Sequence, residues 1–217
     1  MIAGLKSELA ALRDSWPDVQ SFAAGGSAAR AEKAARAMDV DVLISIGLAG
    51  GLDPSLRCGD VVVGTGVVTA DGTTYETDRD WRAHAAHDLA GVGGPVAAAV
   101  YGSDVAVTSA ADKAALLRRS GAVAVDMESH GVARAAVARG LKLVVLRVIA
   151  DPADRAIPAS ALGGMAPDGS TRALPVLGAL LLDPREIPAI ARLARDSRQA
   201  HQALRRVALG LAGLVRG

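Results

Sequence analysis

The stretch ISIGLAGGLDPSLRCGDVVV, residues 44–63, predicts two buried strands joined through small residues. An apolar run leads into the segment Gly47 to Gly51, and a second apolar run begins at Val61. Continuous apolar runs bounded by turn residues are typical of strands buried in a sheet. Glycine has no side chain, so it lets a backbone approach a neighbour closely. The segment could cradle an anion or a sugar oxygen with its amides, or form a tight strand-to-loop connection with no ligand.

Outward from this stretch, strand-like and helix-like segments alternate along the chain. We expect helices over residues 5–14, 27–38, 81–90, 110–119 and 128–139, and strands over residues 19–24, 42–47, 61–69, 96–101, 105–107, 122–125 and 143–149. Such alternation predicts an α/β domain with a largely parallel or mixed sheet. Residues 1–217 are expected to form one domain, with residues 172–217 as a helical tail packed on it. The first four residues resemble the end of a strand, so the first strand is expected to be short or the chain start late.

Composition and charge exclude several classes of function. Lys and Arg number 24 and Asp and Glu 23, so no overall field attracts nucleic acid. Aromatic residues make up only 2%, which leaves few stacking platforms for single strands. The single cysteine, Cys58, cannot form an internal disulfide, and no metal-ligand spacing surrounds it. We find no leader and no apolar run that would span a membrane, so a cytoplasmic protein is expected.

The stretch VAVDMESHGVARAA, residues 123–136, places acidic side chains where a strand meets a helix. Acidic residues favour the first turn of a helix, which would explain Asp126 without a ligand. Glu128 begins an otherwise apolar helix, and its carboxylate could accept hydrogen bonds from the two hydroxyls of a ribose. Met127 would form a soft apolar wall beside such a sugar. His130 and Arg134 are expected at solvated positions.

The stretch VLRVIADPADRAIP, residues 145–158, ends its buried strand at Asp151. Burial there would raise the pKa of this carboxyl group. A carboxylic acid that stays protonated near neutral pH can act as a general acid at a leaving group. The alternative is an Asp-Pro corner that only shapes the next turn. Asp154 is expected to be structural, as a cap or as the partner of Arg155.

A further carboxylate stands near the start of the chain, in AGLKSELAAL, residues 3–12. Glu8 lies one turn into the first expected helix, where it could activate a water molecule. An exposed glutamate on the helix surface is the more common arrangement.

These pieces, in this order, resemble the nucleoside phosphorylase and nucleosidase family. The family includes methylthioadenosine/S-adenosylhomocysteine nucleosidases and bacterial purine nucleoside phosphorylases. IGLAGGLDPSLRCGDVVV resembles its glycine loop and following strand, AVDMES its ribose-binding motif, and VLRVIADPAD its catalytic-aspartate strand. The resemblance implies a single three-layer α/β/α domain with a central mixed β-sheet, and an enzyme that cleaves N-glycosidic bonds.

The resemblance also implies roles for individual residues. Asp151 matches the aspartate that protonates or hydrogen-bonds N7 of the departing purine. Glu128 matches the glutamate that holds the 2′ and 3′ hydroxyls, Met127 matches the methionine packed under the sugar, and Asp126 is counted with these substrate-binding residues. Glu8 falls where nucleosidases keep the glutamate that positions the attacking water.

The glycine segment contributes the wall near the ribose and the nucleophile, through Ala49, Gly50 and Gly51. The implied reaction loosens the glycosidic bond toward an oxocarbenium-like cation, which a water or a phosphate then attacks. No cofactor and no metal are expected.

Two departures from the family pattern bear on the reaction. Leu48 stands where phosphorylases usually place a Ser or Thr that binds phosphate, which favours hydrolysis and leaves inorganic phosphate only as a possible co-substrate. Residues 25–27 and Arg30 could compensate. Near Ala106 and Val107 the nucleosidases commonly carry an aromatic residue that stacks on adenine. The side chains here are small, so base recognition would rest on backbone contacts, with Val107 among the substrate-binding residues.

Two apolar segments suggest what surrounds the site. Residues 156–182, with Gly163 and Gly164 as a hinge, could form a lid suited to a lipid-sized 5′ substituent, or could pack on a partner subunit. The last helix, residues 187–215, places apolar side chains near one face. Packing in the core or on a subunit is favoured over a helix that lies on a membrane surface.

Within the family, VDMESHGVARAA and the C-terminal tail look most like the hopanoid-associated members, which are implicated in removing adenine from adenosylhopane. We therefore expect a small-molecule nucleoside substrate, possibly lipid-linked, a peripheral membrane contact and a homo-oligomer, dimeric or larger. The alternatives are a methylthioadenosine/S-adenosylhomocysteine nucleosidase and a general purine nucleoside phosphorylase. A binding module without activity is disfavoured because Asp151 and Glu128 are both present.

Overall fold

The computed structural model describes residues 1–92, 94–162, 164, 166, 168–171, 176 and 184–216. Its sheet has eight strands: β1 (Ile2–Ala3), β2 (Phe22–Ala23), β3 (Val42–Gly51), β4 (Val61–Val68), β5 (Thr74–Glu76), β6 (Val96–Gly102), β7 (Ala124–Asp126) and β8 (Lys142–Asp151). The described helices are α1 (Lys6–Leu12), α2 (Ala28–Ala37), α3 (Arg79–Asp88), η1 (Ala90–Val92), α4 (Ala110–Ser120), α5 (Ser129–Arg139), α6 (Ala159–Leu162), η2 (Pro184–Glu186), α8 (Ile187–Gly210) and α9 (Ala212–Arg216).

The sheet is mixed and closes on itself. The strands follow the order β2-β1-β3-β7-β6-β4-β5, and β8 bridges β3 and β4, so β3, β7, β6, β4 and β8 form a ring. β8 runs parallel to β3 and antiparallel to β4. The expected α/β class with a mixed sheet is confirmed.

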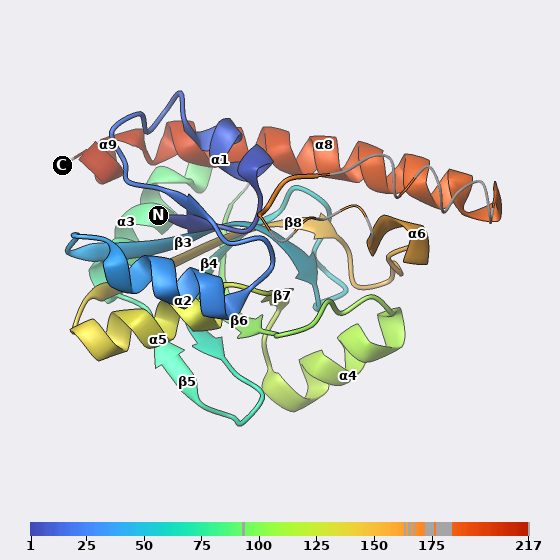
Figure 1. Cartoon of the computed structure of the whole chain (residues 1–217), viewed down its shortest axis with the longest axis horizontal. Helices are drawn as coiled ribbons and strands as arrows, with labels where there is room; N and C mark the ends of the chain where they lie inside the picture. Colours follow the sequence, from blue (N-terminus) through green and yellow to red (C-terminus); the bar gives the residue numbers. More distant parts are fainter. Residues whose placement is uncertain are drawn as a thin grey trace.

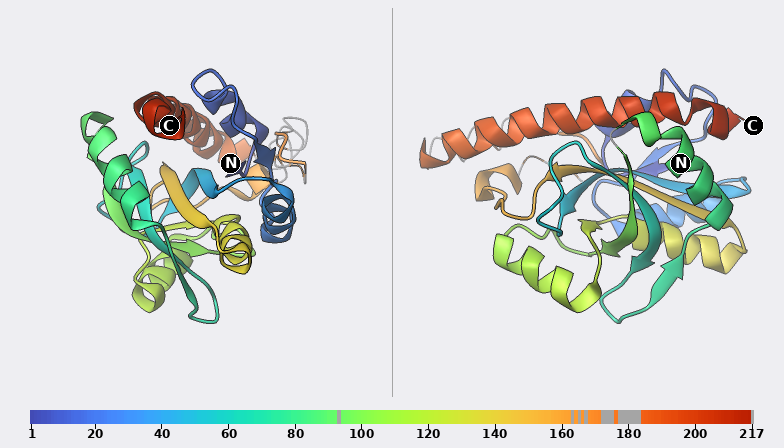
Figure 2. Two further views of the ribbon diagram at one scale, coloured as in Figure 1. Left: turned by 90° about the vertical axis from the view of Figure 1, so that its left-hand side faces the viewer. Right: turned by 180° about the vertical axis from the view of Figure 1, so that it is seen from behind.

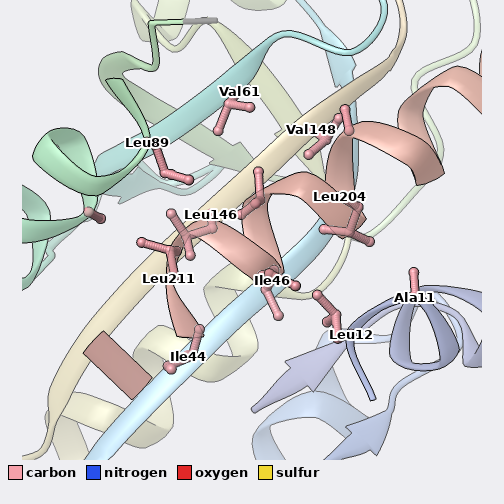
Figure 3. Packing of buried hydrophobic residues seen from close by; sticks show 14 of the residues in the cluster. Ala11, Leu12, Ile44, Ile46, Val61, Leu89, Leu146, Val148, Leu204 and Leu211 are labelled. Carbon is pink, nitrogen blue, oxygen red and sulfur yellow. The ribbon is translucent and has the colours of Figure 1, made fainter. Parts of the chain in front are cut away.

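Helices cover the sheet on opposite sides, as Figure 1 and Figure 2 show. On one side α1 and α8 pack on the strands, and Leu204 of α8 and Leu211, which directly follows α8, meet Ile46 and Leu146 of the sheet (Figure 3). On the other side lie α2 and α5, whose small buried residues include Ala31, Ala35 and Ala133. The three layers expected from the sequence are therefore present.

The two halves of helix α8 have different environments. Its second half buries Ala203, Leu204 and Val207, and its first half projects beyond the sheet, above α6 (Figure 1). The helix begins at Ile187, with Pro188 in its first turn, where the missing proline N–H costs no hydrogen bond. The expected start of the last helix at residue 187 is confirmed, and so is the packing of its apolar face in the core. In the described part of the chain, no helix combines the length and the apolar character that crossing a bilayer would need.

Two short segments differ from the sequence-based expectation. Residues 105–107 are not a strand. The Ser103 hydroxyl donates to the Val105 carbonyl at 2.6 Å, and such local hydrogen bonds compete with a strand ladder. The strand β5 was not expected. It has only three residues, which give no clear apolar pattern, and it forms because it pairs antiparallel with β4. The expected helix over residues 172–183 lies outside the described residues, apart from residue 176.

The glycine segment continues a strand rather than breaking it. β3 runs through Gly51, paired with β8 as far as Gly50 and with β7 at its end. A register shift between Ala49 and Gly50 marks a bulge at this point. The expected turn after Gly47 is therefore wrong, and the segment is not a loop whose amides converge on an anion.

Candidate active site

A cavity of about 320 Å³ opens where β3, β7 and β8 end. Its walls come from the start of α1, the loop of residues 105–107, the junction of β7 with α5, and the apolar side of α6 and α8. The structure brings eight of the residues singled out from the sequence to this one cavity, whereas Gly51 does not line it: Glu8, Ala49, Gly50, Val107, Asp126, Met127, Glu128 and Asp151. Residues from five separate segments therefore converge on a single space.

Glu8 is held by backbone amides at the edge of the cavity. Its Oε2 accepts hydrogen bonds from the amides of Gly4 and Leu5, both at 2.8 Å, and its Oε1 accepts one from the Leu48 amide at 2.9 Å. The residue is only 3% exposed, so the reading as an exposed helix glutamate is wrong. Burial raises the pKa of Glu8, while the Leu48 and Leu5 amides and Arg147 oppose that rise. The carboxylate is fixed in place and can accept a further hydrogen bond from a water.

Glu128 directly precedes α5, makes no side-chain capping hydrogen bond there, and is also buried. Its pKa is raised to about 8, first by burial and then by the negative charges of Asp126 and Glu8. A carboxyl group with this pKa is largely protonated at neutral pH, so it can donate a hydrogen bond as well as accept one.

Asp126 is bound on both of its oxygens by protein donors. Oδ1 accepts the amides of Glu128 at 2.9 Å and Ser129 at 2.8 Å, which caps α5 as the helix-terminus reading expects. Oδ2 accepts the Ser129 hydroxyl and the Arg147 Nε, the latter at 2.5 Å. Burial acts to raise the pKa of Asp126, but Arg147 and Ser129 outweigh it and the pKa is lowered.

Arg147 lies beneath the cavity floor and is 1% exposed. Besides Asp126, its guanidinium donates to the Ser45 hydroxyl at 2.6 Å and the Ser129 hydroxyl at 2.8 Å. It therefore joins β3, β8 and the start of α5. The group also lowers the pKa of both Glu8 and Glu128 from a distance.

Asp151 ends β8, and its side chain is 14% exposed. Its Oδ2 accepts a hydrogen bond at 2.5 Å from Nζ of Lys113, a residue of α4 that is fully buried. Burial raises the pKa of Asp151, and the ammonium group of Lys113 opposes the rise. The result is a carboxyl group at the cavity wall with an elevated pKa and a fixed orientation.

Each of the three catalytic candidates faces a glycine. A Cβ added at Gly47 would lie 2.8 Å from Glu8, one at Gly4 would lie 2.9 Å from Glu128, and one at Gly50 would lie 3.1 Å from Asp151. Contacts under 3.0 Å require something to move, so the first two glycines leave the space that their carboxylates fill. Within the glycine segment, Gly47 and Gly50 therefore lie against acidic side chains.

The remaining wall of the cavity is apolar. Leu5 and Leu48 lie on one part of it, and Ile157, Ala161 and Leu193 come from the segment around α6 and from α8. Residues 163, 165, 167, 172–175 and 177–182 of the expected lid lie outside the described residues. Of the described residues in this segment, Ile157 and Ala161 contribute to the cavity wall.

Several expectations about neighbouring side chains are wrong. His130 is 3% exposed, with Nε2 2.9 Å from Oδ1 of Asp104, because the absence of a side chain at Gly102 makes room for the ring. Arg155 pairs with Asp196 of α8 rather than with its neighbour in the sequence.

The remaining expectations concern arginines. Arg134 is half-buried and donates to Glu32 at 2.7 Å, so it is only partly solvated. Arg30 lies 5.8 Å from the Phe22 ring centroid, in a separate groove, and does not line the cavity.

Two functional candidates were missed in the sequence, Lys113 and Arg147. Both carry a signal that could have found them. Arg147 is a charged residue inside an apolar strand, and Lys113 is a cation in the first turn of a helix, where the helix dipole disfavours it. Within the described residues, no set of three or more His, Cys, Asp and Glu is placed to hold a metal ion.

Comparison with known proteins shows the family and the fold. The model of the phosphorylase superfamily matches residues 24–182, a range that contains Glu128 and Asp151 but not Glu8. A comparison with the curated proteins finds none that matches.

Solved structures share the fold at low sequence identity. A 5′-methylthioadenosine/S-adenosylhomocysteine nucleosidase from Colwellia psychrerythraea, in complex with adenine, gives a TM-score of 0.73 at 19% identity, over 99% of this chain and 93% of that one. The corresponding nucleosidase from S. pneumoniae gives 0.67 at 17% identity, over 97% of each chain. A futalosine hydrolase mutant from Helicobacter pylori gives 0.63 at 18% identity, over 71% of this chain and 88% of that one.

Proposed function

The chain belongs to the phosphorylase superfamily, and we propose that it cleaves the N-glycosidic bond of an adenine nucleoside and releases the base. The observation that carries the proposal is the convergence of Glu8, Glu128 and Asp151 on one cavity. Solved structures of nucleosidases with the same fold support the same reaction class.

The charges around the cavity suit a cationic transition state. Asp126 and Glu8 lie close enough to raise the pKa of Glu128, and Arg147 acts to lower the pKa of all three groups. A sugar that develops oxocarbenium character beside them gains favourable electrostatic interactions that the neutral ground state does not have.

The three carboxyl groups then divide the work. Asp151, with its raised pKa, donates a proton or a hydrogen bond to the departing base. Glu128 binds the sugar hydroxyls, since a carboxyl group near its pKa can both donate to and accept from a diol. Met127, next to it on the cavity wall, packs against the sugar, and Glu8 positions the attacking water.

Water is the proposed nucleophile. The Leu48 amide, which could otherwise help bind an anion, already donates to Glu8 at 2.9 Å. Among the described residues that line the cavity there is no Ser, Thr, Lys or Arg. Phosphate would therefore meet acidic and apolar groups, so hydrolysis is favoured over phosphorolysis.

The 5′ substituent of the substrate is proposed to be apolar. The wall formed by Ile157, Ala161 and Leu193 offers no hydrogen-bonding side chain to a free 5′ hydroxyl. A lipid-linked nucleoside such as adenosylhopane fits this chemistry and the hopanoid-like sequence motifs. Methylthioadenosine or S-adenosylhomocysteine is the second candidate, supported by the solved nucleosidases of the same fold.

A lipid substrate would place the enzyme at the cytoplasmic surface of a membrane. The apolar face of α8 is used in the core, so an amphipathic insertion of that helix is not the mode of contact. Its solvent-facing side instead carries five exposed arginines that could meet anionic headgroups: Arg192, Arg195, Arg198, Arg205 and Arg206. Val105, at the cavity rim, is 69% exposed, which supports a homo-oligomer in which a second copy covers the rim.

Adenine release tests the proposal. The wild-type protein would be assayed with 5′-methylthioadenosine and with adenosylhopane in detergent, each with and without phosphate, beside Asp151→Asn as the inactive reference. Release from adenosylhopane that does not depend on phosphate supports a lipid nucleosidase. Release only with phosphate would replace hydrolysis by phosphorolysis, and no release from either nucleoside would overturn the proposed activity.

A further inference from the structure

We propose that Lys113 is a positioning residue, which holds the Asp151 carboxyl group so that one oxygen stays free to meet the leaving base. This role rests on the proposed function, since it assumes that Asp151 acts on the base. The ammonium group occupies Oδ2 at 2.5 Å, and among the described residues no donor to Oδ1 is found.

The side chain of Lys113 is surrounded by hydrogen-bond acceptors. Besides the carboxylate, Nζ lies within hydrogen-bond distance of the backbone carbonyls of Pro152 at 2.9 Å, Arg155 at 3.0 Å and Asp151 at 3.4 Å. All four neighbours are acceptors, so every proton of the ammonium group has a partner. A neutral amine would instead turn a lone pair toward a carbonyl oxygen.

The placement of this lysine is costly unless it serves the carboxylate. Its side chain has no solvent exposure, and it lies in the first turn of α4, beside the positive end of the helix dipole. A buried cation is tolerated when it is paired and fully hydrogen-bonded. The pair thus joins α4 to the end of β8.

The same contacts also fix the segment that follows Asp151. Lys113 binds the carbonyls of residues 152 and 155, and the amide of Ile157 donates to the Thr108 carbonyl at 2.8 Å just before α4. Ile157 lines the cavity, so the lysine connects the acidic group and the apolar wall.

No other nearby cation is placed to replace Lys113 within the described part of the chain. The guanidinium of Arg155, the next basic group along the segment, is bound to Asp196 of α8. The carboxylate of Asp112, beside Lys113 in the sequence, accepts the Ser109 hydroxyl at 2.6 Å, and Ser109 caps the helix by accepting the Asp112 amide at 3.0 Å. Lys113 is therefore the group through which the orientation of Asp151 is controlled.

A double-mutant cycle tests this role. Adenine release would be measured for wild type, Lys113→Met, Asp151→Asn and the double variant, with Lys142→Met as the control. Lys142 is an exposed lysine at the opposite end of β8, so its loss tests the removal of a lysine as such. Lys113→Met is expected to lower kcat about 100-fold with KM within about threefold of wild type, a loss typical of a misplaced general acid.

The double variant gives the decisive result. If Lys113 acts through Asp151, the double variant is as slow as Asp151→Asn alone, within about threefold, because the lysine has nothing left to position. If the two losses multiply, or if Lys113→Met keeps kcat within about threefold of wild type, the inference is overturned.

Two further outcomes are covered by the design. Should Lys113→Met fail to fold by circular dichroism, Lys113→Gln takes its place in the cycle, since a glutamine can still donate to the backbone carbonyls. Absence of adenine release from the wild type overturns the proposed function itself, whereas an active wild type with an equally active Lys113 variant overturns the positioning role alone.

Discussion

A methyl group on the Cα of Gly47 would lie 2.8 Å from Oε2 of Glu8. The Glu8 carboxylate can keep its position only because residue 47 has no side chain. The contact explains how a strand residue controls a helix residue that is 39 positions earlier in the sequence. Gly47 thus differs from glycines such as Gly72 and Gly121, where an added Cβ would meet nothing within 4 Å.

Gly47→Ala is expected to reduce adenine release more than tenfold, because the new methyl group pushes the Glu8 carboxylate away from the Leu48 amide and from its water. Overpacking of this kind typically costs about 1–3 kcal/mol of stability, so the variant should still fold. Steady-state kinetics and a urea titration would measure the two effects. Gly91→Ala is the matched control, since a Cβ there meets nothing within 4 Å. Equal kinetics for the two variants would refute the assigned role of the contact.

Arg147→Met is expected to lower the free energy of unfolding by about 3–5 kcal/mol, because it leaves the buried Asp126 carboxylate without its cation. Urea denaturation followed by circular dichroism would measure the loss. Adding Asp126→Asn should recover part of it, since the neutral amide needs no counter-charge. A double variant less stable than Arg147→Met would show that the ion pair is not the source of the loss.

Glu128→Gln is expected to change how stability depends on pH. The pKa of Glu128 is about 8 in the folded protein and 4.5 in its ordinary state, so between these values the folded protein keeps a proton that the unfolded chain has lost. This contribution to stability is full below pH 4.5 and is lost as the pH rises toward 8. Glutamine stays neutral at every pH, so the stability of the variant relative to the wild type should increase as the pH rises.

Thermal unfolding at pH 5, 7 and 9 would show this gain as a Tm difference that grows by about 5 °C or more in favour of Glu128→Gln. Glu76→Gln, at an exposed position of β5, is the control for loss of a carboxylate. A Tm difference that stays constant over this range would contradict a raised pKa.

Leu193→Ala is expected to weaken binding of nucleosides with a long apolar 5′ substituent while leaving adenosine unaffected. Removing buried methyl and methylene groups that contact such a substituent should raise KM roughly tenfold, at about 0.8 kcal/mol for each group. Inhibition constants for a series of 5′-alkylthioadenosines of increasing length would measure the effect. Equal changes for short and long members would mean that Leu193 does not contact the substituent. Leu209→Ala, at an exposed site on the same helix, is the control.

The acidic residues of the site could be predicted from the sequence because their positions relative to strand ends are local information. Asp151 ends one apolar run, and Glu128 lies three residues beyond Val125, the last residue of another. That these two segments meet was not given by the parallel-strand rule, because β7 runs antiparallel to β3 whereas β8 runs parallel to it. The burial of Glu8 could not be predicted in this way, since one turn of helix gives no sign that a strand far along the chain will cover its side chain.

What the sequence could not predict depends on contacts between distant segments. The glycine segment was expected to break its strand, yet pairing with β8 and β7 on either edge keeps it extended. His130 was expected in solvent, but its ring is buried because Gly102 has no side chain in the space that the ring fills. The partners of the carboxylates, Lys113 and Arg147, were overlooked for the same reason, although their position in a helix start and in an apolar strand was visible.

The ring of five strands has a consequence for self-association. A strand inside the ring has neighbours on both edges, so little of its backbone is free to template pairing with another molecule. The outermost strands of the described sheet, β2 and β5, contain two and three residues. Edges this short are poor seeds for aggregation, so copies of this chain should associate through side-chain contacts rather than by extending one continuous sheet.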